Sequence, residues 1–282
     1  MSELRGFAID LAVTAGRLAQ SQAPSVDRAT IQAKRDRDYV TQVDQLVERE
    51  IVARIRERFP DHAILGEESG STFGSSGASG GESSGAPLWV IDPIDGTTNF
   101  IHGLPQWSVS IALCAAGVPQ VAVVRDPCKD ETFSAERGQG AWLNGQPMKT
   151  SGCATLRQAL VATAMPFRFS EVHAEALRVF GEIQASCDDQ RRGGSAALDL
   201  AWVAAGRLDA YYELGIYPWD IAAGDLLVAE AGGVVSDYAG NTTGLLQRRS
   251  VIAAATASVQ AGLLFRVSPL VPWLVRTPFD RV

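Results

Sequence analysis

Residues 89–100 read Trp89-Val90-Ile91-Asp92-Pro93-Ile94-Asp95-Gly96-Thr97-Thr98-Asn99-Phe100, an apolar strand that ends in a polar turn able to open a helix. Asp92 and Asp95 stand three residues apart with a proline between them, and a glycine and two threonines follow at once. Carboxylates at a strand end suit Mg²⁺, which prefers oxygen ligands. A glycine before a helix start offers free backbone N–H groups to a phosphate. The stretch therefore predicts metal-assisted phosphate chemistry.

Three further segments place an acidic residue beside a glycine or at a helix start: Gly66-Glu67-Glu68-Ser69, Thr41-Gln42-Val43-Asp44 and Trp219-Asp220-Ile221. Each also has an ordinary explanation, because paired acids are common in exposed loops and acids or threonines are common in a first helical turn. The Asp-Pro-x-Asp-Gly sequence itself is good turn chemistry. The occurrence of all four segments in one chain favours the functional explanation.

Together, these segments resemble the inositol monophosphatase family of Mg²⁺-dependent, lithium-sensitive sugar phosphatases. The resemblance covers roughly residues 4 to 265, and it depends on the motifs jointly, because any one of them alone would be weak. One segment looks like the bacterial inositol-1-monophosphatase version in particular. The motifs are Asp38–Asp44, Gly66–Ser69, Asp92–Phe100, the bacterial-type segment Arg191–Leu200, and Trp219–Asp225 running on to Glu230-Ala231-Gly232-Gly233.

The resemblance implies an α/β fold, a layered α/β/α/β/α sandwich of the sugar phosphatase type. Residues 1–150 would form an N-terminal α+β half that has a mixed or antiparallel sheet and carries most metal ligands. Residues 151–282 would form a C-terminal, doubly wound α/β half that carries substrate contacts and one metal ligand. The order of elements agrees, because helices and a strand meander precede residue 150 and strands alternate with helices after it.

The resemblance also implies the roles of single residues. Glu67, Asp92 and the Ile94 carbonyl would hold a first Mg²⁺, and Asp92, Asp95 and Asp220 a second. Glu67 would orient water around a weaker third ion. Thr97, hydrogen-bonded to Asp44, would position the attacking water and help to deprotonate it. The substrate contacts would come from Asp95, Gly96, Thr97, Gly194, Ser195, Ala196 and Glu213.

These roles lead to an expected activity, the Mg²⁺-dependent hydrolysis of myo-inositol monophosphate. A related phosphatase acting on fructose 1,6-bisphosphate or histidinol phosphate is the alternative, and so is a regulatory or binding protein that keeps the fold. The Asp209–Asp220 segment leans toward inositol among the sugar phosphates. The resemblance further implies a homodimer.

Composition excludes some classes of partner. The chain has 282 residues, a net charge of −7 and a pI near 5.1. An acidic surface makes nucleic acid or an anionic membrane an unlikely main partner. Four widely spaced cysteines form no zinc or disulfide pattern, and residues 1–20 lack the pattern of a signal peptide. No apolar run is long enough to span a bilayer. We therefore expect a cytoplasmic protein.

Periodicity predicts the main elements. Apolar residues recur at helical spacing over residues 4–18 and 43–55, and residues 107–116, 119–125, 131–135 and 141–143 read as strands. Asn144-Gly145 is a strong signal for a tight turn. The later pattern predicts strands at 160–164, 209–213, 234–236 and 251–255, and helices at 171–185, 195–205, 219–231 and 258–265. Residues 71–87, rich in Gly and Ser, are expected to form a mobile loop. The family core does not explain residues 267–282.

Overall fold

The computed structural model describes residues 1–23, 32–35, 38–72, 86–166 and 169–276. The α-helices are α1 Glu3–Gln22, α2 Gln42–Arg58, α3 Thr97–His102, α4 His173–Gln184, α5 Ala196–Ala204, α6 Pro218–Glu230, α7 Ala257–Val267 and α8 Trp273–Arg276. The strands are β1 Gln32–Arg35, β2 Asp38–Val40, β3 Ala63–Gly66, β4 Gly70–Thr72, β5 Leu88–Asp95, β6 Ser108–Ala115, β7 Val118–Asp126, β8 Glu131–Glu136, β9 Gly140–Leu143, β10 Gln146–Met148, β11 Leu160–Thr163, β12 Asp189–Arg191, β13 Ala210–Leu214, β14 Val234–Ser236 and β15 Ser250–Ala254.

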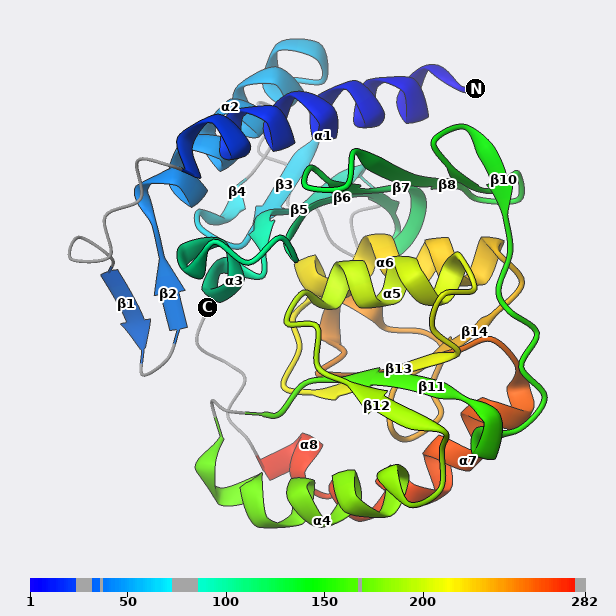
Figure 1. The fold of residues 1–282 in the computed structure, drawn as a ribbon. Coiled ribbons are helices and arrows are strands. Elements are labelled where there is room, and N and C mark those ends of the chain that lie inside the picture. Colours follow the sequence, from blue (N-terminus) through cyan, green and yellow to red (C-terminus); the bar gives the residue numbers. More distant parts are fainter. Residues whose placement is uncertain (24–31, 36–37, 73–85, 167–168, 277–282) are drawn as a thin grey trace.

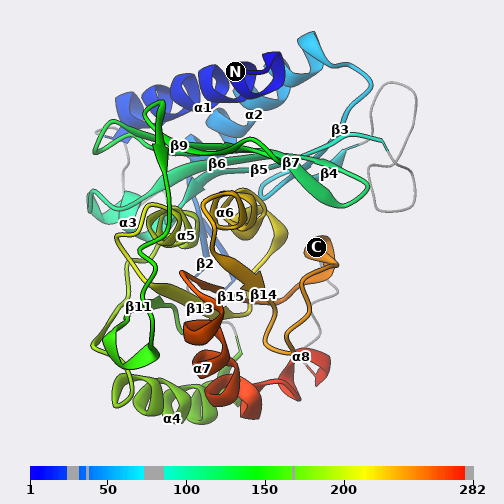
Figure 2. The same cartoon turned by 90° about the vertical axis from the view of Figure 1, so that its right-hand side faces the viewer.

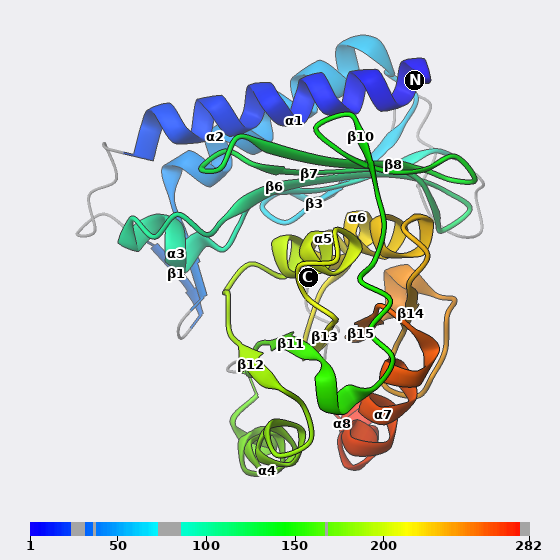
Figure 3. The same ribbon diagram turned by 45° about the vertical axis from the view of Figure 1, so that its right-hand side comes forward.

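Helices and sheets alternate in five layers (Figure 1). Helices α1 and α2 cover the outer face of the larger sheet, and α5 and α6 lie between the two sheets (Figure 2). Helices α4 and α7 cover the outer face of the smaller sheet, as Figure 3 also shows. The predicted α/β/α/β/α sandwich is therefore confirmed.

The larger sheet has the strand order β10-β9-β8-β7-β6-β5-β3-β4. All neighbouring pairs are antiparallel except β3 with β5, which run parallel. Strand β5 is buried along its whole length, because α1 and α2 cover one of its faces and α6 covers the other. Its carboxyl end therefore delivers Asp92 and Asp95 to the interior of the molecule.

The smaller sheet has the order β12-β11-β13-β15-β14. Strand β11 is parallel to both of its neighbours, whereas β15 is antiparallel to β13 and β14. Helices cover both faces of this sheet, as predicted for a doubly wound half. Its strands, however, run in mixed directions. Strand β13 lies in the middle of this sheet, and Glu213 stands near its carboxyl end.

The middle helices join the two sheets through one apolar core. Gly224 of α6 lies so close to α5 that a Cβ at this position would come within 2.4 Å of Leu200. One buried cluster includes Val90 of the larger sheet, Leu198 of α5 and Tyr211 of the smaller sheet. The division of the chain at residue 150 stays a prediction, because the α5–α6 layer packs on both sheets.

The predicted elements agree with the observed ones to within a few residues. Asn144 and Gly145 have φ values of 49° and 78°, and they form the predicted tight turn between β9 and β10. The short strands β1, β2, β4, β10 and β12 and the short helix α3 were not specified by periodicity. Most of the expected Gly/Ser loop, residues 73–85, and the end of the tail, residues 277–282, lie outside the described residues. No described helix is both long enough and apolar enough to cross a membrane.

Candidate active site

A cavity of about 230 Å³ opens where the two sheets and the middle helices meet. Its wall includes the end of β5, the starts of α3, α5 and α6, and the end of β13. Glu67, Asp92, Ile94, Asp95, Thr97 and Asp220 all line it, as do Gly96, Gly194, Ser195, Ala196 and Glu213. The fold thus gathers these predicted site residues around one space, although they come from distant segments.

Asp92 occupies an irregular part of β5. The pairing of β5 with β6 shifts register between Asp92 and Asp95, and the Asp92 Oδ1 atom accepts a hydrogen bond from the Ile94 backbone at 3.0 Å. The turn fixes the direction of the carboxylate, which is 1% exposed. Burial raises the pKa of Asp92 well above its ordinary value, and the neighbouring charge of Glu67 raises it further.

Asp95 links the end of β5 to the start of α5. Its Oδ2 atom accepts hydrogen bonds from the Ser195 hydroxyl at 2.6 Å and from the Ala197 backbone N–H at 2.7 Å. Burial raises the pKa of Asp95 to about 6, against the lowering effect of these bonds. These donors from the start of α5 fix the direction of the Asp95 carboxylate.

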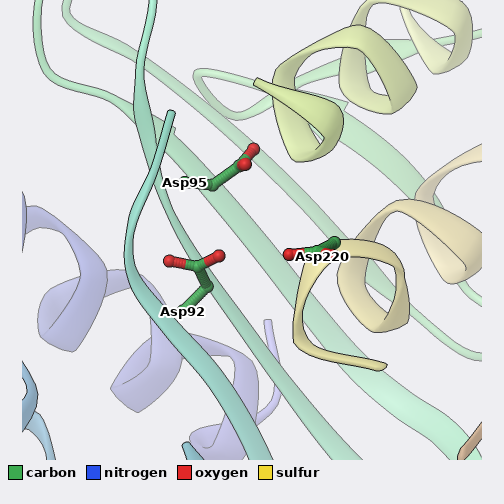
Figure 4. Close-up of side chains that lie close together, drawn as sticks. All are labelled: Asp92, Asp95 and Asp220. Carbon is green, nitrogen blue, oxygen red and sulfur yellow. The ribbon is translucent and has the colours of Figure 1, made fainter. Parts of the chain in front are cut away.

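Asp220 reaches the same place from the first turn of α6. Its Oδ2 atom accepts a hydrogen bond from the Tyr217 backbone N–H at 2.8 Å, which caps the helix. Asp220 thus serves as a helix-start acid and also points toward β5, as Figure 4 shows. Burial, followed by the charges of Asp95 and Glu67, raises the pKa of Asp220 well above its ordinary value.

The three aspartates form a candidate metal centre. Ligand oxygens of Asp92, Asp95 and Asp220 lie within 4.8 Å of one another (Figure 4). Carboxylates this close and this deeply buried disfavour one another's ionised forms, so a cation bound between them would lower the energy of the ionised group. The set contains only carboxylate oxygens, the donors that Mg²⁺ prefers. The residues present therefore fit the ion that the sequence predicts.

Glu67 lies in the wall of the same cavity, on the turn that follows β3. The Glu67 N–H donates to the Ile91 carbonyl of β5 at 3.2 Å. The next two N–H groups, of Glu68 and Ser69, donate to the side chain of Glu48 on α2 at 2.9 and 2.7 Å. Glu48 is 2% exposed and was missed in the sequence, where it reads as one more charge on a helix.

Thr97 and Asp44 meet beside the metal centre. The Thr97 hydroxyl lies 3.1 Å from the Ile94 carbonyl and 3.3 Å from Asp44 Oδ1, so its proton is shared between two acceptors. Asp44 is also the capping acid of α2, because its Oδ2 atom accepts from the Thr41 N–H at 3.0 Å. Burial raises the pKa of Asp44 to about 6.

Two glycines let the backbone segments at the cavity come together. Gly96 has a φ of 97°, and a Cβ there would come within 3.1 Å of the Gly194 carbonyl. Gly194 has a φ of 88°, and a Cβ there would come within 2.9 Å of the Asn99 side-chain nitrogen. Asn99 in turn donates to the carbonyls of Gln106 and Gly193 at 2.6 and 2.9 Å. These contacts tie α3 to the segment before α5.

Glu213 and Asp199 also line the cavity. The Tyr211 hydroxyl donates to the Glu213 carboxylate. Asp199, on α5, was quoted in the sequence only as part of a motif. A single acid in the apolar run Ala197-Leu198-Asp199-Leu200-Ala201 is the signal that could have identified it.

Comparisons with known proteins agree with the fold and the motifs. Residues 1–269 match the model of the inositol monophosphatase family. The Nus factor SuhB of Pseudomonas aeruginosa is 43% identical over 96% of this chain and 98% of that protein. The extragenic suppressor protein suhB of Bartonella henselae has a TM-score of 0.86 and 35% identity, over 94% of this chain and 98% of that one. The inositol monophosphatase of Anabaena has a TM-score of 0.79 and 35% identity, over 94% and 95%. The chain belongs to the inositol monophosphatase family.

Proposed function

We propose that this protein is a Mg²⁺-dependent phosphatase that hydrolyses myo-inositol monophosphate to inositol and phosphate. The observation that carries the proposal is the convergence of Asp92, Asp95 and Asp220, whose ligand oxygens lie within 4.8 Å of one another in the wall of one cavity. Family membership supports the activity, and the Anabaena relative is named for it. The solvent-accessible cavity beside the three carboxylates offers room for a phosphate ester.

The metal ligands follow the family pattern. We assign Glu67, Asp92 and the Ile94 carbonyl to one Mg²⁺ and Asp92, Asp95 and Asp220 to another, with Glu67 near a weaker third ion. Mg²⁺ bound there would supply Lewis acidity and would lower the pKa of an attacking water. The protein's part is to hold the carboxylates in fixed directions, which the bonds from Ile94, Ser195 and Tyr217 accomplish.

Thr97 and Asp44 are the proposed general-base pair. The Thr97 hydroxyl is 3.3 Å from the Asp44 carboxylate, so a proton received by the threonine oxygen can pass to a buried acid. Burial raises the pKa of Asp44 to about 6, closer to neutrality than an exposed aspartate, and this suits a base that operates near neutral pH. Hydrolysis would then need neither a covalent intermediate nor a histidine.

The remaining contacts are assigned to the substrate. The amides of Gly96 and Thr97 would bind the phosphate, with Asp95 nearby. Gly194, Ser195 and Ala196, at the start of α5, and Glu213, at the end of β13, would contact the inositol hydroxyls. Support comes from their place in the wall of one cavity.

A regulatory role is the second candidate function. The Pseudomonas aeruginosa relative is named as a factor rather than as an enzyme, and this favours a protein that keeps the fold for binding. Other sugar or polyol phosphates, including fructose 1,6-bisphosphate and histidinol phosphate, remain alternative substrates. We further propose that the protein is a cytoplasmic homodimer. Each chain would consist of two halves, divided near residue 150.

Phosphate release measures the proposed activity directly. Purified protein should release phosphate from myo-inositol 1-phosphate with millimolar Mg²⁺ and should be inactive in excess chelator. The highest kcat/KM in a panel of sugar and polyol phosphates should belong to the inositol ester. Li⁺ should inhibit uncompetitively, because it can replace Mg²⁺ with half the charge. Absence of turnover on the whole panel would favour the regulatory candidate.

A further inference from the structure

The side chain of Asp199 is buried and has no hydrogen-bond partner among the residues that the structure describes. Asp199 is 2% exposed, and its side chain accepts no hydrogen bond from the residues that the structure describes. It nevertheless lines the cavity that holds the metal centre. Buried polar groups are normally hydrogen-bonded, and burial, together with the charges of Asp95 and Glu213, raises the pKa of Asp199 well above its ordinary value. The Asp199 carboxyl can therefore accept a hydrogen bond from a donor other than the described residues.

The described neighbours of Asp199 do not donate a hydrogen bond to its side chain. The two acids whose charges act on it most, Asp95 and Glu213, are acceptors like itself. Gly193 lies against the carboxylate, and a Cβ at this position would come within 2.6 Å of Asp199 Oδ1. Because residue 193 has no side chain, it offers no side-chain donor to the acid. Glu213, in contrast, already accepts the Tyr211 hydroxyl.

We propose that Asp199 selects the substrate by accepting a hydrogen bond from a hydroxyl of the leaving group, beside Glu213. The two carboxylates would then receive two different hydroxyls, so the site would favour phosphate esters of alcohols that carry several free hydroxyls. This inference rests on the proposed phosphatase function and specifies the substrate class of that site. A site with buried acceptors discriminates strongly against analogues that lack the matching donor.

The first test compares substrates in one variant. Asp199→Asn should lower kcat/KM for myo-inositol 1-phosphate by about 10–100-fold, the range for loss of a hydrogen bond to a charged group. Glycerol 2-phosphate, which has fewer hydroxyls, should lose at most a few-fold. Among mono-deoxy inositol phosphates, the analogue that lacks the hydroxyl bound by Asp199 should be a poor substrate of the wild type. Asp199→Asn should lower kcat/KM for that analogue little further. Asp188→Asn, at an exposed acid of the same half, is the matched control and should change nothing.

A second variant keeps Asp199 but displaces its carboxylate. Gly193→Ala brings a Cβ within 2.6 Å of Asp199 Oδ1, too close for a van der Waals contact, so the carboxylate must shift from its position in the cavity wall. This variant should show the same loss of selectivity for myo-inositol 1-phosphate over glycerol 2-phosphate as Asp199→Asn. In the ligand-free protein, Asp199→Asn should leave the melting temperature unchanged or raise it, because no hydrogen bond from a described residue is lost and an acid beside Asp95 and Glu213 is removed. A drop in melting temperature would reveal a structural role and overturn the proposal.

Binding separates this inference from the proposed function. Calorimetry with myo-inositol 1-phosphate, with Ca²⁺ in place of Mg²⁺, reports affinity even if the wild type shows no turnover. Weaker binding in both variants, with unchanged Ca²⁺ affinity, supports the assignment of Asp199. The assignment would be overturned by an equal loss of kcat/KM on all substrates or by a changed metal affinity. A loss confined to histidinol phosphate, which carries an amine, would also overturn it. Failure of the phosphatase function alone would appear as binding without phosphate release.

Discussion

Asp44 shows how one side chain can serve the scaffold and the site together. One carboxylate oxygen caps the first turn of α2 through Thr41, and the other lies 3.3 Å from the Thr97 hydroxyl. The ordinary explanation of this acid as a helix-start residue and the functional explanation are therefore compatible. Substitutions can separate them, because the cap and the base use different oxygens.

A double-mutant cycle tests the proposed base. Thr97→Ala and Asp44→Asn should each lower kcat by roughly 10²–10⁴-fold, the range for loss of a general base. The double variant should lose little more, since residues that act as one unit are not additive. Thr41→Ala is the control for the cap, and it should cost about 1 kcal/mol of stability while kcat changes little. Fully multiplicative losses at Thr97 and Asp44 would contradict the pairing.

The metal centre allows a volume-conserving test. Asp95→Asn and Asp220→Asn each remove a charge but keep the shape of the side chain, so the fold should persist. Turnover should fall by roughly 10³-fold or more, because the ligand set is incomplete and its residues act as a unit. Circular dichroism and phosphate release measure the two effects. Wild-type-like rates in either variant would contradict its assignment as a metal ligand.

Single residues also show what sequence patterns reveal and what they conceal. Asp92, Asp95 and Asp220 stand in recognisable segments, so their convergence could be predicted. Glu48 could not, because a charge on a helix is usually exposed and only tertiary packing buries this one, and Asp199 had only its place in an apolar run as a signal. Their significance depends on which face of the helix the neighbouring layer covers.

Helix α2 connects two parts of the site. Asp44 and Glu48 are four residues apart and lie on one face of the helix. Asp44 reaches Thr97, and Glu48 accepts from the N–H groups of Glu68 and Ser69, on the turn that carries Glu67. Gly66 makes this approach possible, because a Cβ there would come within 2.7 Å of Glu48 Oε2. Glu48 is therefore a positioning residue for Glu67.

Glu48→Gln tests this positioning. A glutamine can keep only one of its two acceptor positions, so the turn that carries Glu67 should become less well ordered. We expect the Mg²⁺ concentration for half-maximal activity to rise about 10-fold, the lower end for loss of a supporting interaction at a metal site, while KM for the substrate stays unchanged. Glu50→Gln, at an exposed acid of the same helix, should leave both values unchanged. An effect on KM alone would contradict the positioning role.

Long periodic elements were predictable and short ones were not. Helices α1 and α2 and strands β6 to β9 follow from apolar spacing, because each buries a continuous face. Strand β12 is three residues long with an exposed arginine, and its pairing with β11 is a tertiary contact without a local pattern. Helix α3 is six residues long. Its only sequence signal is Gly96-Thr97-Thr98, in which the glycine precedes the helix and the two threonines begin it.

At the scale of the whole molecule, the site depends on how the layers meet. Asp95 of β5 accepts from Ser195 and Ala197 at the start of α5, and Asn99 holds the Gly193 carbonyl. Sequence resemblance predicted which residues take part. It could not give the order of the smaller sheet, in which β13 and β15 are antiparallel, because strand direction depends on the path of the chain between elements.

The buried acids predict how stability depends on pH and Mg²⁺. In the metal-free fold, burial raises the pKa of Asp44 and of Asp95 from 3.8 to about 6, and it raises the pKa values of Asp92 and Asp220 as well. Between about pH 4 and pH 6 the folded state holds protons that the unfolded chain has released, so the free energy of unfolding should fall as pH rises. Mg²⁺ binds the ionised carboxylates and releases those protons, so its stabilising effect should grow with pH.

Chemical denaturation with and without millimolar Mg²⁺ measures this effect. The metal-free protein should be less stable at about pH 7.5 than at about pH 5, and Mg²⁺ should restore stability mainly at the higher pH, where the acids are ionised. Asp220→Asn should weaken the response to Mg²⁺ and flatten the pH dependence, because it removes one acid from the group. NaCl at matched ionic strength controls for screening. An equal Mg²⁺ effect at both pH values would show that the ion binds elsewhere than at these carboxylates.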